Sequence, residues 1–417
     1  MKRKGFAMKP LSPLLPITIL LWALLAGCDN GNGSASTAQP SETTQQTNTI
    51  RTVPMFYNGE EFEGYDIDPP LKDVPLVEIQ RRAQADDPAA ISELGRRYIR
   101  GDGVPRDQDR GFELAEQAAQ LGDVDALNDI ALAYSNGLFS FEKDQKKAAE
   151  YFRRAAEQGD ALAQGNLGLA YEFGQGVEQD YKEAFQWFLK AAKQGFPTDQ
   201  NKVGYFYDFG QGVQEDKTEA TKWYCKAAEQ GYAEAQLNLG IQYALGEGAK
   251  QDTEEEIKWY RKAAEQGHAR AQYNLGTMYN YGDGVAVNYA EAASWYRKAA
   301  AQGHAAAQAN LGTIYLHGKG VEVDYAAAYA WFLKSAKQGD PGGLFNLGQL
   351  YEHGGHVSED SAKAYAHYSL ALLEKTEISE PAMESLSTLK AQMTPAEIQS
   401  GEREIKKLMS EYGKRDR

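Results

Sequence analysis

Six histidines and two cysteines are the residues of this 417-residue sequence best suited to metal binding or nucleophilic catalysis. The histidines include two pairs spaced by 36 residues and the run His353-Gly-Gly-His356, which has a spacing that suits a transition metal. Side chains 36 residues apart on stacked helices, which lie about 8–10 Å from one another, are too distant to share an ion. We therefore interpret the histidines as surface variation and expect no metal or other cofactor. They are His268, His304, His317, His353, His356 and His367.

Cys225 lies within a predicted helix, and the nearest histidine in the sequence, His268, is 43 residues away. Because a cysteine nucleophile needs a base within reach, we interpret Cys225 as a structural residue. The acidic run 254–256 opens a predicted helix, where the helix dipole explains it. Ser335 is followed by Ala336 and Lys337 and so gives no Ser-x-x-Lys nucleophile. The sequence therefore predicts no enzymatic activity.

The other cysteine, Cys28, follows a segment typical of a cleaved signal. Residues 1–27 carry four basic residues and then an apolar stretch that is too short to span a bilayer comfortably and is broken by prolines. The stretch ends in Leu25-Ala26-Gly27-Cys28, which resembles the bacterial lipobox. The resemblance implies cleavage before Cys28 and acylation of that residue, including palmitate. Several acyl chains on one residue bind a membrane firmly.

Asp29, directly after the cysteine, resembles an inner-membrane retention signal of enteric bacteria. We therefore expect a lipoprotein that faces the periplasm, with the inner membrane favoured and the outer membrane as the alternative. Residues 28–50 are polar and small, which is typical of a flexible tether. Residues 51–86 are expected to form an N-terminal extension: an extended segment that packs against the body, then a short helix over 77–85.

The net charge is strongly negative. The whole chain carries -15 at pH 7, and removal of the four basic residues in 1–27 leaves -19. Such a surface repels phosphate backbones, so we expect no nucleic-acid partner. Contact with the membrane is expected through the lipid anchor only.

Self-similarity dominates residues 87–373, where several columns of residues recur at 36-residue spacing with one interval of 37. Such a period indicates a solenoid of about eight units. A Leu-Gly pair provides one column, and a tyrosine falls three residues after it in every unit. The glycines are Gly95, Gly168, Gly204, Gly240, Gly276, Gly312 and Gly348, with Ala131 in the second unit. The tyrosines are Tyr98, Tyr134, Tyr171, Tyr207, Tyr243, Tyr279, Tyr315 and Tyr351.

The unit 232–267 predicts two antiparallel helices. Gly240 lies inside the first helix, where glycine costs about 1 kcal/mol relative to alanine, so its recurrence indicates close helix–helix contact. Gly246 is expected to end this helix in the left-handed conformation. Asp252 is expected to cap the second helix, with Glu255 completing a capping box. Neither helix buries its apolar face alone, so neighbouring units stabilise each other.

The pattern A-x-A-Q-x-N-L-G-x-x-Y-x-x-G-x-G-V-x-x-D-Y-x-x-A-x-x-W-Y-x-K-A-A-x-Q-G resembles the Sel1-like repeat, a relative of the tetratricopeptide repeat. The resemblance implies an all-α fold, a right-handed α/α superhelical solenoid, and a mainly non-catalytic role as an adaptor. Unit two departs from the pattern at 136–140, where Asn-Gly-Leu-Phe-Ser replaces the Gly-x-Gly-Val turn. Residues 374–417 lose the repeat and predict a helical cap, with Thr394, Pro395 and Glu397 as a helix start.

The predicted binding site lies on the first helix of each unit. In the related tetratricopeptide repeats this helix lines a groove in which asparagine holds a peptide backbone or carboxylate. Here an asparagine precedes Leu-Gly in several units, although a structural hydrogen bond is the other interpretation of that column. The residue two positions after the repeated tyrosine varies between units and is aromatic in several of them. The candidate groove residues are Asn166, Asn238, Asn274, Asn310, Asn346, Phe173, Phe209 and Tyr281.

These features predict a protein–protein interaction adaptor at the bacterial cell envelope, with envelope proteins or peptides as partners. One alternative is a scaffold lipoprotein of a polysaccharide-export or secretion machine. A β-lactamase or peptidoglycan hydrolase is a further alternative, since some cysteine-rich Sel1-like proteins are described as β-lactamases. Those proteins carry paired cysteines in their repeats, and this sequence does not.

Overall fold

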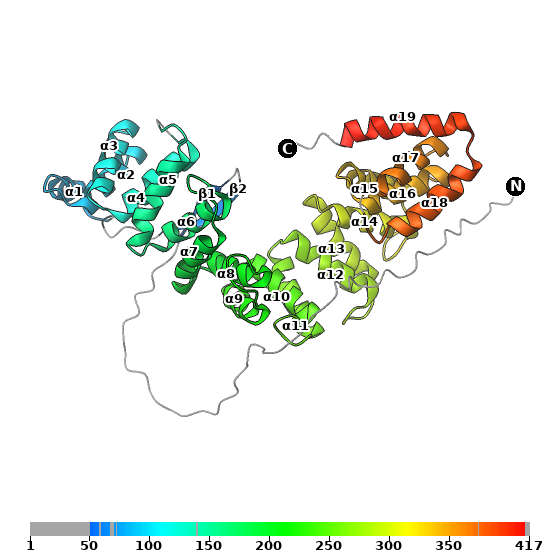
Figure 1. The fold of residues 1–417 in the computed structure, drawn as a ribbon, viewed down its shortest axis with the longest axis horizontal. Coiled ribbons are helices and arrows are strands. Elements are labelled where there is room, and N and C mark those ends of the chain that lie inside the picture. The colour runs from blue at the N-terminus through cyan, green and yellow to red at the C-terminus, as the bar shows by residue number, and fades with distance from the viewer. Residues whose placement is uncertain are drawn as a thin grey trace, which may run out of the picture. The chain divides into compact units, whose positions relative to one another are not determined.

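The structure, a computed structural model, describes residues 51–57, 60–66, 71, 73–138, 141–373 and 375–412, and only the backbone of those before residue 67. The chain divides into two compact units, with the boundary between Gln230 and Gly231. The described residues of each unit consist mainly of antiparallel helix pairs that follow one another along the chain (Figure 1).

In the unit that ends at Gln230, a β-hairpin precedes four helix pairs. Its elements are β1 (Arg51–Tyr57), β2 (Glu60–Asp66), α1 (Leu76–Ala83), α2 (Pro88–Arg100), α3 (Gln108–Gln120), α4 (Val124–Asn136), α5 (Gln145–Glu157), α6 (Ala161–Phe173), α7 (Tyr181–Lys193), α8 (Pro197–Phe209) and α9 (Lys217–Glu229). The strands are antiparallel, with Arg51 opposite Asp66. The sequence analysis predicted an extended segment here but no hairpin. The pair Asn58-Gly59 between the strands is one that favours two-residue hairpin turns.

The unit that begins at Gly231 contains four further helix pairs and two terminal helices. They are α10 (Ala233–Leu245), α11 (Thr253–Glu265), α12 (Ala269–Tyr281), α13 (Tyr289–Ala301), α14 (Ala305–His317), α15 (Tyr325–Lys337), α16 (Pro341–His353), α17 (Ser361–Ala371), α18 (Ser379–Gln392) and α19 (Pro395–Tyr412). Both α18 and α19 pack against α17 and so cover the end of the array. No helix in the described part of the chain is long and apolar enough to cross a membrane.

Local sequence sets the ends of the repeat helices. In the fifth repeat, Gly246 ends α10 with a left-handed φ of 70°, and the Asp252 carboxylate accepts from the backbone N–H groups of Glu254 and Glu255 at 3.0 and 3.1 Å. The corresponding residue accepts backbone N–H groups in all eight second helices. The prediction that this column caps the second helices is confirmed.

The capping box predicted at Glu255 is wrong. Its carboxylate accepts hydrogen bonds from Lys258 and Trp259 instead. The Asp252 N–H is already satisfied, since it donates to the carbonyl of Tyr243. At α19, where no such carbonyl competes, the predicted box forms: the Thr394 N–H donates to Glu397 at 2.7 Å, and the Glu397 N–H donates to the Thr394 hydroxyl at 3.3 Å.

The glycine inside the first helix marks a close contact with the second helix, as predicted, and in the third to eighth repeats the contact is with an aromatic ring. A methyl group on Gly240 would lie 2.6 Å from the Tyr260 ring, which is far inside van der Waals contact. The same relation holds in both units. The pairs are Gly168–Phe188, Gly204–Tyr224, Gly276–Tyr296, Gly312–Phe332 and Gly348–Tyr368, at 2.5–2.8 Å.

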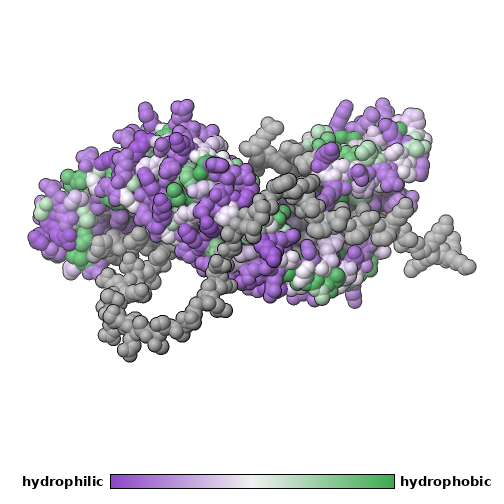
Figure 2. Space-filling model, turned by 60° about the horizontal axis from the view of Figure 1, so that its bottom comes forward, coloured by the Kyte–Doolittle hydropathy of each residue, from purple (hydrophilic) through white to green (hydrophobic). Residues whose placement is uncertain are grey.

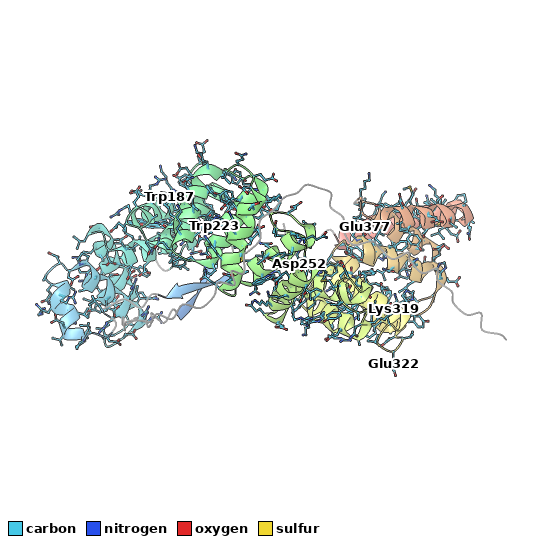
Figure 3. The ribbon with its side chains drawn as sticks, turned by 90° about the horizontal axis from the view of Figure 1, so that it is seen from below. Trp187, Trp223, Asp252, Lys319, Glu322 and Glu377 are labelled. Atoms are coloured by element: carbon cyan, nitrogen blue, oxygen red, sulfur yellow. The ribbon has the colours of Figure 1, made fainter. Side chains whose placement is uncertain are left out.

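First helices also contact one another across repeats. Helix α4 packs on α2 in the compact unit that ends at Gln230, and α16 packs on α14 in the compact unit that begins at Gly231. The second helices carry tryptophans, of which Figure 3 labels Trp187 and Trp223. Lys190 and Lys226 lie 3.4 and 3.9 Å from the ring centroids of these two residues. Both indoles are buried, each 9% exposed, and the lysine side chains help to cover them. The two faces of each helix pair therefore differ in chemistry.

The substitution Gly312→Ala tests the close contact. We expect it to destabilise the protein by about 1–2 kcal/mol, because strain against the Phe332 ring outweighs the gain in helix propensity. In a double-mutant cycle with Phe332→Leu, the alanine should cost measurably less, since the ring atoms that it meets are gone. Additive free energies of unfolding in the two single variants and the double variant would contradict this packing.

Candidate functional site

The predicted asparagine column lies on the first helices, at positions that face the second helix of the preceding repeat. Each asparagine falls 14 residues after an aromatic residue of the preceding second helix, and for all but Asn166 that residue covers the repeated glycine. Asn166, Asn274 and Asn310 are half-buried, and Asn346 is buried. The column therefore lies at the junction between repeats.

Where the preceding aromatic residue is tyrosine, the asparagine binds its hydroxyl. Asn274 hydrogen bonds with Tyr260, and Asn310 hydrogen bonds with Tyr296. Burial raises the pKa of both hydroxyls, and the amide contacts oppose that shift only in part. The Tyr296 hydroxyl also donates to Thr277 at 3.1 Å. These two amides thus have structural partners.

Where the preceding residue is phenylalanine, no hydroxyl is available, and the residue in the asparagine column has a different partner or none. After Phe332, Asn346 donates to the carbonyl of Gly342 in its own helix at 2.8 Å. After Phe188, the column holds Lys202, whose ammonium lies 5.9 Å from the Phe188 ring centroid. After Phe152, the Nδ2 of Asn166 is buried with no hydrogen-bond partner among the described residues. The partner of the residue at this position therefore depends on the aromatic residue before it.

A second polar column, which the sequence analysis did not assign, joins repeats through paired glutamines. The Gln302 Nε2 donates to the Gln272 Oε1 at 2.8 Å and to the carbonyl of Gly267 at 2.8 Å. The Gln272 Nε2 in turn donates to the carbonyl of Ala264. Equivalent pairs are Gln194–Gln164, Gln230–Gln200, Gln266–Gln236 and Gln338–Gln308. The glutamines recur in the repeat pattern itself, so their periodicity was the available signal.

The column two residues after the repeated tyrosine is exposed throughout, at the last residue of each first helix. In the compact unit that ends at Gln230, Phe173 and Phe209 are 50% and 56% exposed. In the compact unit that begins at Gly231, Tyr281 is 42% exposed. Most of the visible surface is hydrophilic, and apolar residues form small separate patches (Figure 2). Exposed aromatic side chains at repeated positions stand out against such a surface.

In the first unit these side chains belong to a patch of aromatic and charged groups, Phe173, Lys202, Tyr205, Phe209 and Lys217. The Tyr205 and Phe209 ring centroids are 4.5 Å apart. The Lys202 ammonium lies 5.8 Å from the Phe173 ring centroid and 3.0 Å from both Glu172 carboxylate oxygens. The Lys217 ammonium lies 5.6 Å from the Phe209 ring centroid. This arrangement holds the aromatic rings in place without burying them.

The histidines have mostly local roles. His268 and His304 are N-caps that accept the N–H of Ala271 and Ala307, so their recurrence reflects helix capping rather than surface variation. His367 is buried at 3% exposure, where burial lowers its pKa. Within the described residues, no three His, Cys, Asp or Glu side chains are close enough to hold a metal ion. Cys225 is buried, and Cys28 lies outside the described residues.

One carboxyl group, that of Asp199 on α8, is buried between repeats. It is 8% exposed and packs against Gly165 of α6. Burial raises its pKa from 3.8 to about 7, and a hydrogen bond from the Thr198 hydroxyl at 3.1 Å only partly offsets this effect. The folded state therefore binds a proton at Asp199 at a pH where the unfolded chain does not.

Comparison with known protein families finds one family whose model matches all eight helix pairs. The model of the Sel1 repeat matches eight segments of the chain: 88–123, 124–160, 161–196, 198–232, 233–268, 269–304, 305–340 and 341–374. These segments coincide with the eight helix pairs. No curated protein matches the chain.

Solved structures of similar proteins include a Sel1 repeat protein from Oxalobacter formigenes. It shares 32% identity over 75% of this chain and 90% of its own, with a TM-score of 0.58. A protective antigen of uropathogenic Escherichia coli with an SLR fold shares 29% identity over 81% of this chain and 87% of its own, with a TM-score of 0.43.

The unpaired Asn166 amide gives a stability prediction. Phe152→Tyr places a hydroxyl where Tyr260 and Tyr296 have theirs, so the amide gains an acceptor. We expect the free energy of unfolding to rise by about 1 kcal/mol, measured by urea denaturation. The matched control is Phe332→Tyr, which should gain less because Asn346 already has a partner. A gain that persists in Phe152→Tyr combined with Asn166→Ala would refute this explanation.

Asp199 predicts a pH dependence. Because its folded pKa is raised, its cost to stability is absent near pH 4, grows as the pH rises towards 7, and is complete above that. Asp199→Asn should therefore stabilise the protein by about 1–3 kcal/mol at pH 8 and have little effect at pH 4. Melting of both proteins from pH 4 to 8 measures the difference, and a constant offset across that range would exclude titration of Asp199 as its cause.

Proposed function

This chain belongs to the Sel1 repeat family, and from that premise we propose that it is an adaptor that holds a protein or peptide partner on its first helices at the bacterial cell envelope. Proteins built from Sel1 repeats generally act as scaffolds for protein interactions and are generally not enzymes. The proposal adds the binding face and the location.

The exposed aromatic residues at the ends of the first helices carry the proposal. Phe173 and Phe209 end α6 and α8, in consecutive repeats, and their side chains are 50% and 56% exposed. Exposed aromatic rings supply much of the binding energy at protein interfaces when a partner covers them. Lys202 and Lys217 are already paired with carboxylates, so burying the rings does not strand a free charge.

The asparagine column contributes to this proposal less than the aromatic column. The side chains of Asn274 and Asn310 already hydrogen bond with tyrosine hydroxyls. The Asn346 side chain already donates to a backbone carbonyl. A buried polar group with a satisfied partner gains little from a ligand. Binding by the aromatic ends of the helices, with asparagines shaping the repeat junctions, is the form of the groove hypothesis that we favour.

The tether part of the proposal rests on the sequence 25–28 and on the polar segment 28–50 that follows. Acylation of Cys28 would hold the repeats near a membrane surface, and Asp29 favours the inner membrane. A tether of this length and composition allows the repeats to reach partners near the membrane without fixing their orientation.

Photocrosslinking in cells tests the function. A photoreactive phenylalanine analogue at position 173 should capture a defined partner, and Phe209→Ala should weaken that adduct at least fivefold. The control is the same analogue at Leu121, which is 49% exposed at the end of a second helix. Equal capture from position 121 would contradict the proposed face.

Cys28→Ser tests the tether in the same cells: it should abolish palmitate labelling and release the protein from the membrane fraction.

A further inference from the structure

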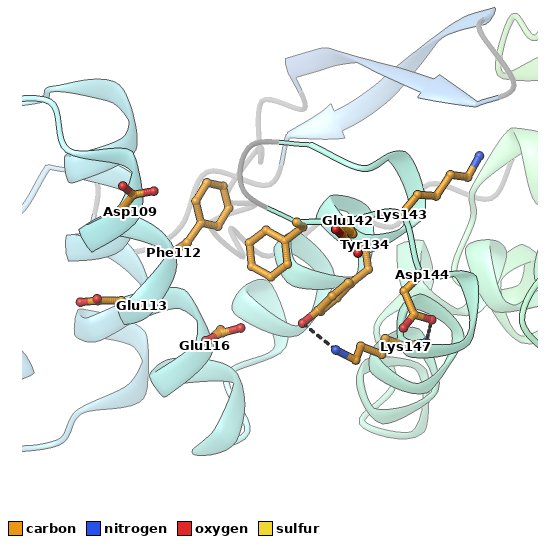
Figure 4. A pocket seen from close by; sticks show the side chains of 10 residues that line it. Asp109, Phe112, Glu113, Glu116, Tyr134, Glu142, Lys143, Asp144 and Lys147 are labelled. Carbon is orange, nitrogen blue, oxygen red and sulfur yellow. Dashed lines mark hydrogen bonds between the residues drawn. The ribbon is translucent and has the colours of Figure 1, made fainter.

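A cavity of about 520 Å³ lies between the first two repeats, within the unit that ends at Gln230. Its walls come from α3, the end of α4, and the segment that leads into α5 (Figure 4). A volume of this size is within the range of sites that bind small molecules or single side chains with their flanking backbone. The lining residues are Asp109, Phe112, Glu113, Glu116, Tyr134, Phe141, Glu142, Lys143, Asp144 and Lys147.

The cavity lies beside the turn of the second repeat, which departs from the family pattern. In the third and fourth repeats the second glycine of the Gly-x-Gly turn, Gly176 or Gly212, lies directly against the start of the preceding second helix, at Gln145 or Tyr181. The second repeat has no Gly-x-Gly pair in its turn. Asp109, at the start of α3, lines the cavity instead.

Three aromatic rings meet at the cavity with their planes nearly perpendicular. Phe141 lies edge-to-face with Phe112 at 5.2 Å and 73°, and with Tyr134 at 4.7 Å and 81°. Ring faces set at right angles form two walls of a box. Such boxes bind cations, because the face of each ring carries negative charge.

The remaining walls are acidic. Asp109 and Glu116 flank Phe112 at i−3 and i+4 on α3, which places all three on one face of the helix. The carboxylates of Asp109, Glu116 and Glu142 make no hydrogen bond or ion pair with other side chains in the described part of the chain. Glu113 binds Arg110 at 2.8 Å, and its side chain points away from the rings (Figure 4). The carboxylates that face the rings are therefore free to pair with a ligand.

One cation of the chain already uses this site. The Lys147 ammonium lies 4.7 Å from the Tyr134 ring centroid and 3.4 Å from its hydroxyl. Lys143 points away from the rings (Figure 4). A ligand cation would thus meet an aromatic face already suited to ammonium, with Lys147 as its only competitor among the lining residues on that side.

We propose that this cavity binds an arginine side chain presented by a basic peptide segment of a partner protein. Phe112 is only 6% exposed, so the ring on which a planar guanidinium can stack is that of the half-buried Tyr134 or Phe141, while its N–H groups reach the carboxylates of Asp109 and Glu116. The strong negative charge of the chain favours the approach of a basic segment. The site shares no residue with the patch around Phe173 and Phe209, so either site can fail without the other.

Fluorescence anisotropy with the full chain tests the proposal. The probes are labelled Gly-Arg-Gly-Arg-Gly and the same peptide with citrulline, which keeps the shape of arginine and removes its charge. We expect the arginine peptide to bind at least tenfold more tightly. Tetramethylammonium serves as a competitor: if it binds more tightly than the peptide, the occupant is a free organic cation and the proposal is wrong.

Variants separate this site from general charge attraction. Asp109→Asn with Glu116→Gln should weaken the arginine peptide at least tenfold, and Lys147→Met should strengthen it about threefold by removing the competing ammonium. Glu113→Gln is the matched control, since its carboxylate turns away; it should change affinity less than twofold. If Glu113→Gln weakens binding as much as Glu116→Gln, the attraction is diffuse and the site does not exist. Unchanged melting of these surface variants establishes that each remains folded.

Discussion

The close approach of the two helices in the third to eighth repeats depends on a glycine under an aromatic ring. With no side chain at Gly240 or Gly312, the ring of Tyr260 or Phe332 reaches the first helix at a distance that any methyl group would block. The glycine costs helix propensity, and the ring recovers that cost by burying its whole face. Because this contact fixes the distance between the helices, the N-caps, the turn glycines and the junction residues all take positions relative to it.

Polar side chains then set how one repeat meets the next. The glutamine pairs bind backbone carbonyls of the preceding second helix, and the asparagine column binds its tyrosines. An apolar junction of small residues tolerates sliding, whereas a buried hydrogen bond is lost by a shift of a single residue. We infer that the apolar contacts supply most of the stability of the junction and that the amides supply its register.

The features that the sequence predicted correctly depend on residues close to one another in the chain. The N-cap at Asp252 and the left-handed Gly246 depend on residues within a few positions, and periodicity made each visible eight times. The capping box at Glu255 failed because the carbonyl that displaced it belongs to Tyr243, in the other helix. The partners of the asparagines depend on a residue in the previous repeat, and the cavity at Phe112 lies beside a turn that departs from the pattern. The groove residues and Cys28 remain predictions, the latter outside the described residues.

The match between the asparagine column and the aromatic residue 14 positions before it has a consequence for how such arrays grow. Repeat genes gain and lose copies by unequal crossing-over, and a crossover between the two positions joins an aromatic residue to an amide inherited from elsewhere. Phe152 before Asn166 leaves the amide nitrogen without a partner among the described residues, whereas Phe188 is followed by Lys202, whose ammonium lies 5.9 Å from the ring centroid. A breakpoint that keeps each second helix together with the first helix that follows it therefore preserves every pairing of aromatic residue and amide.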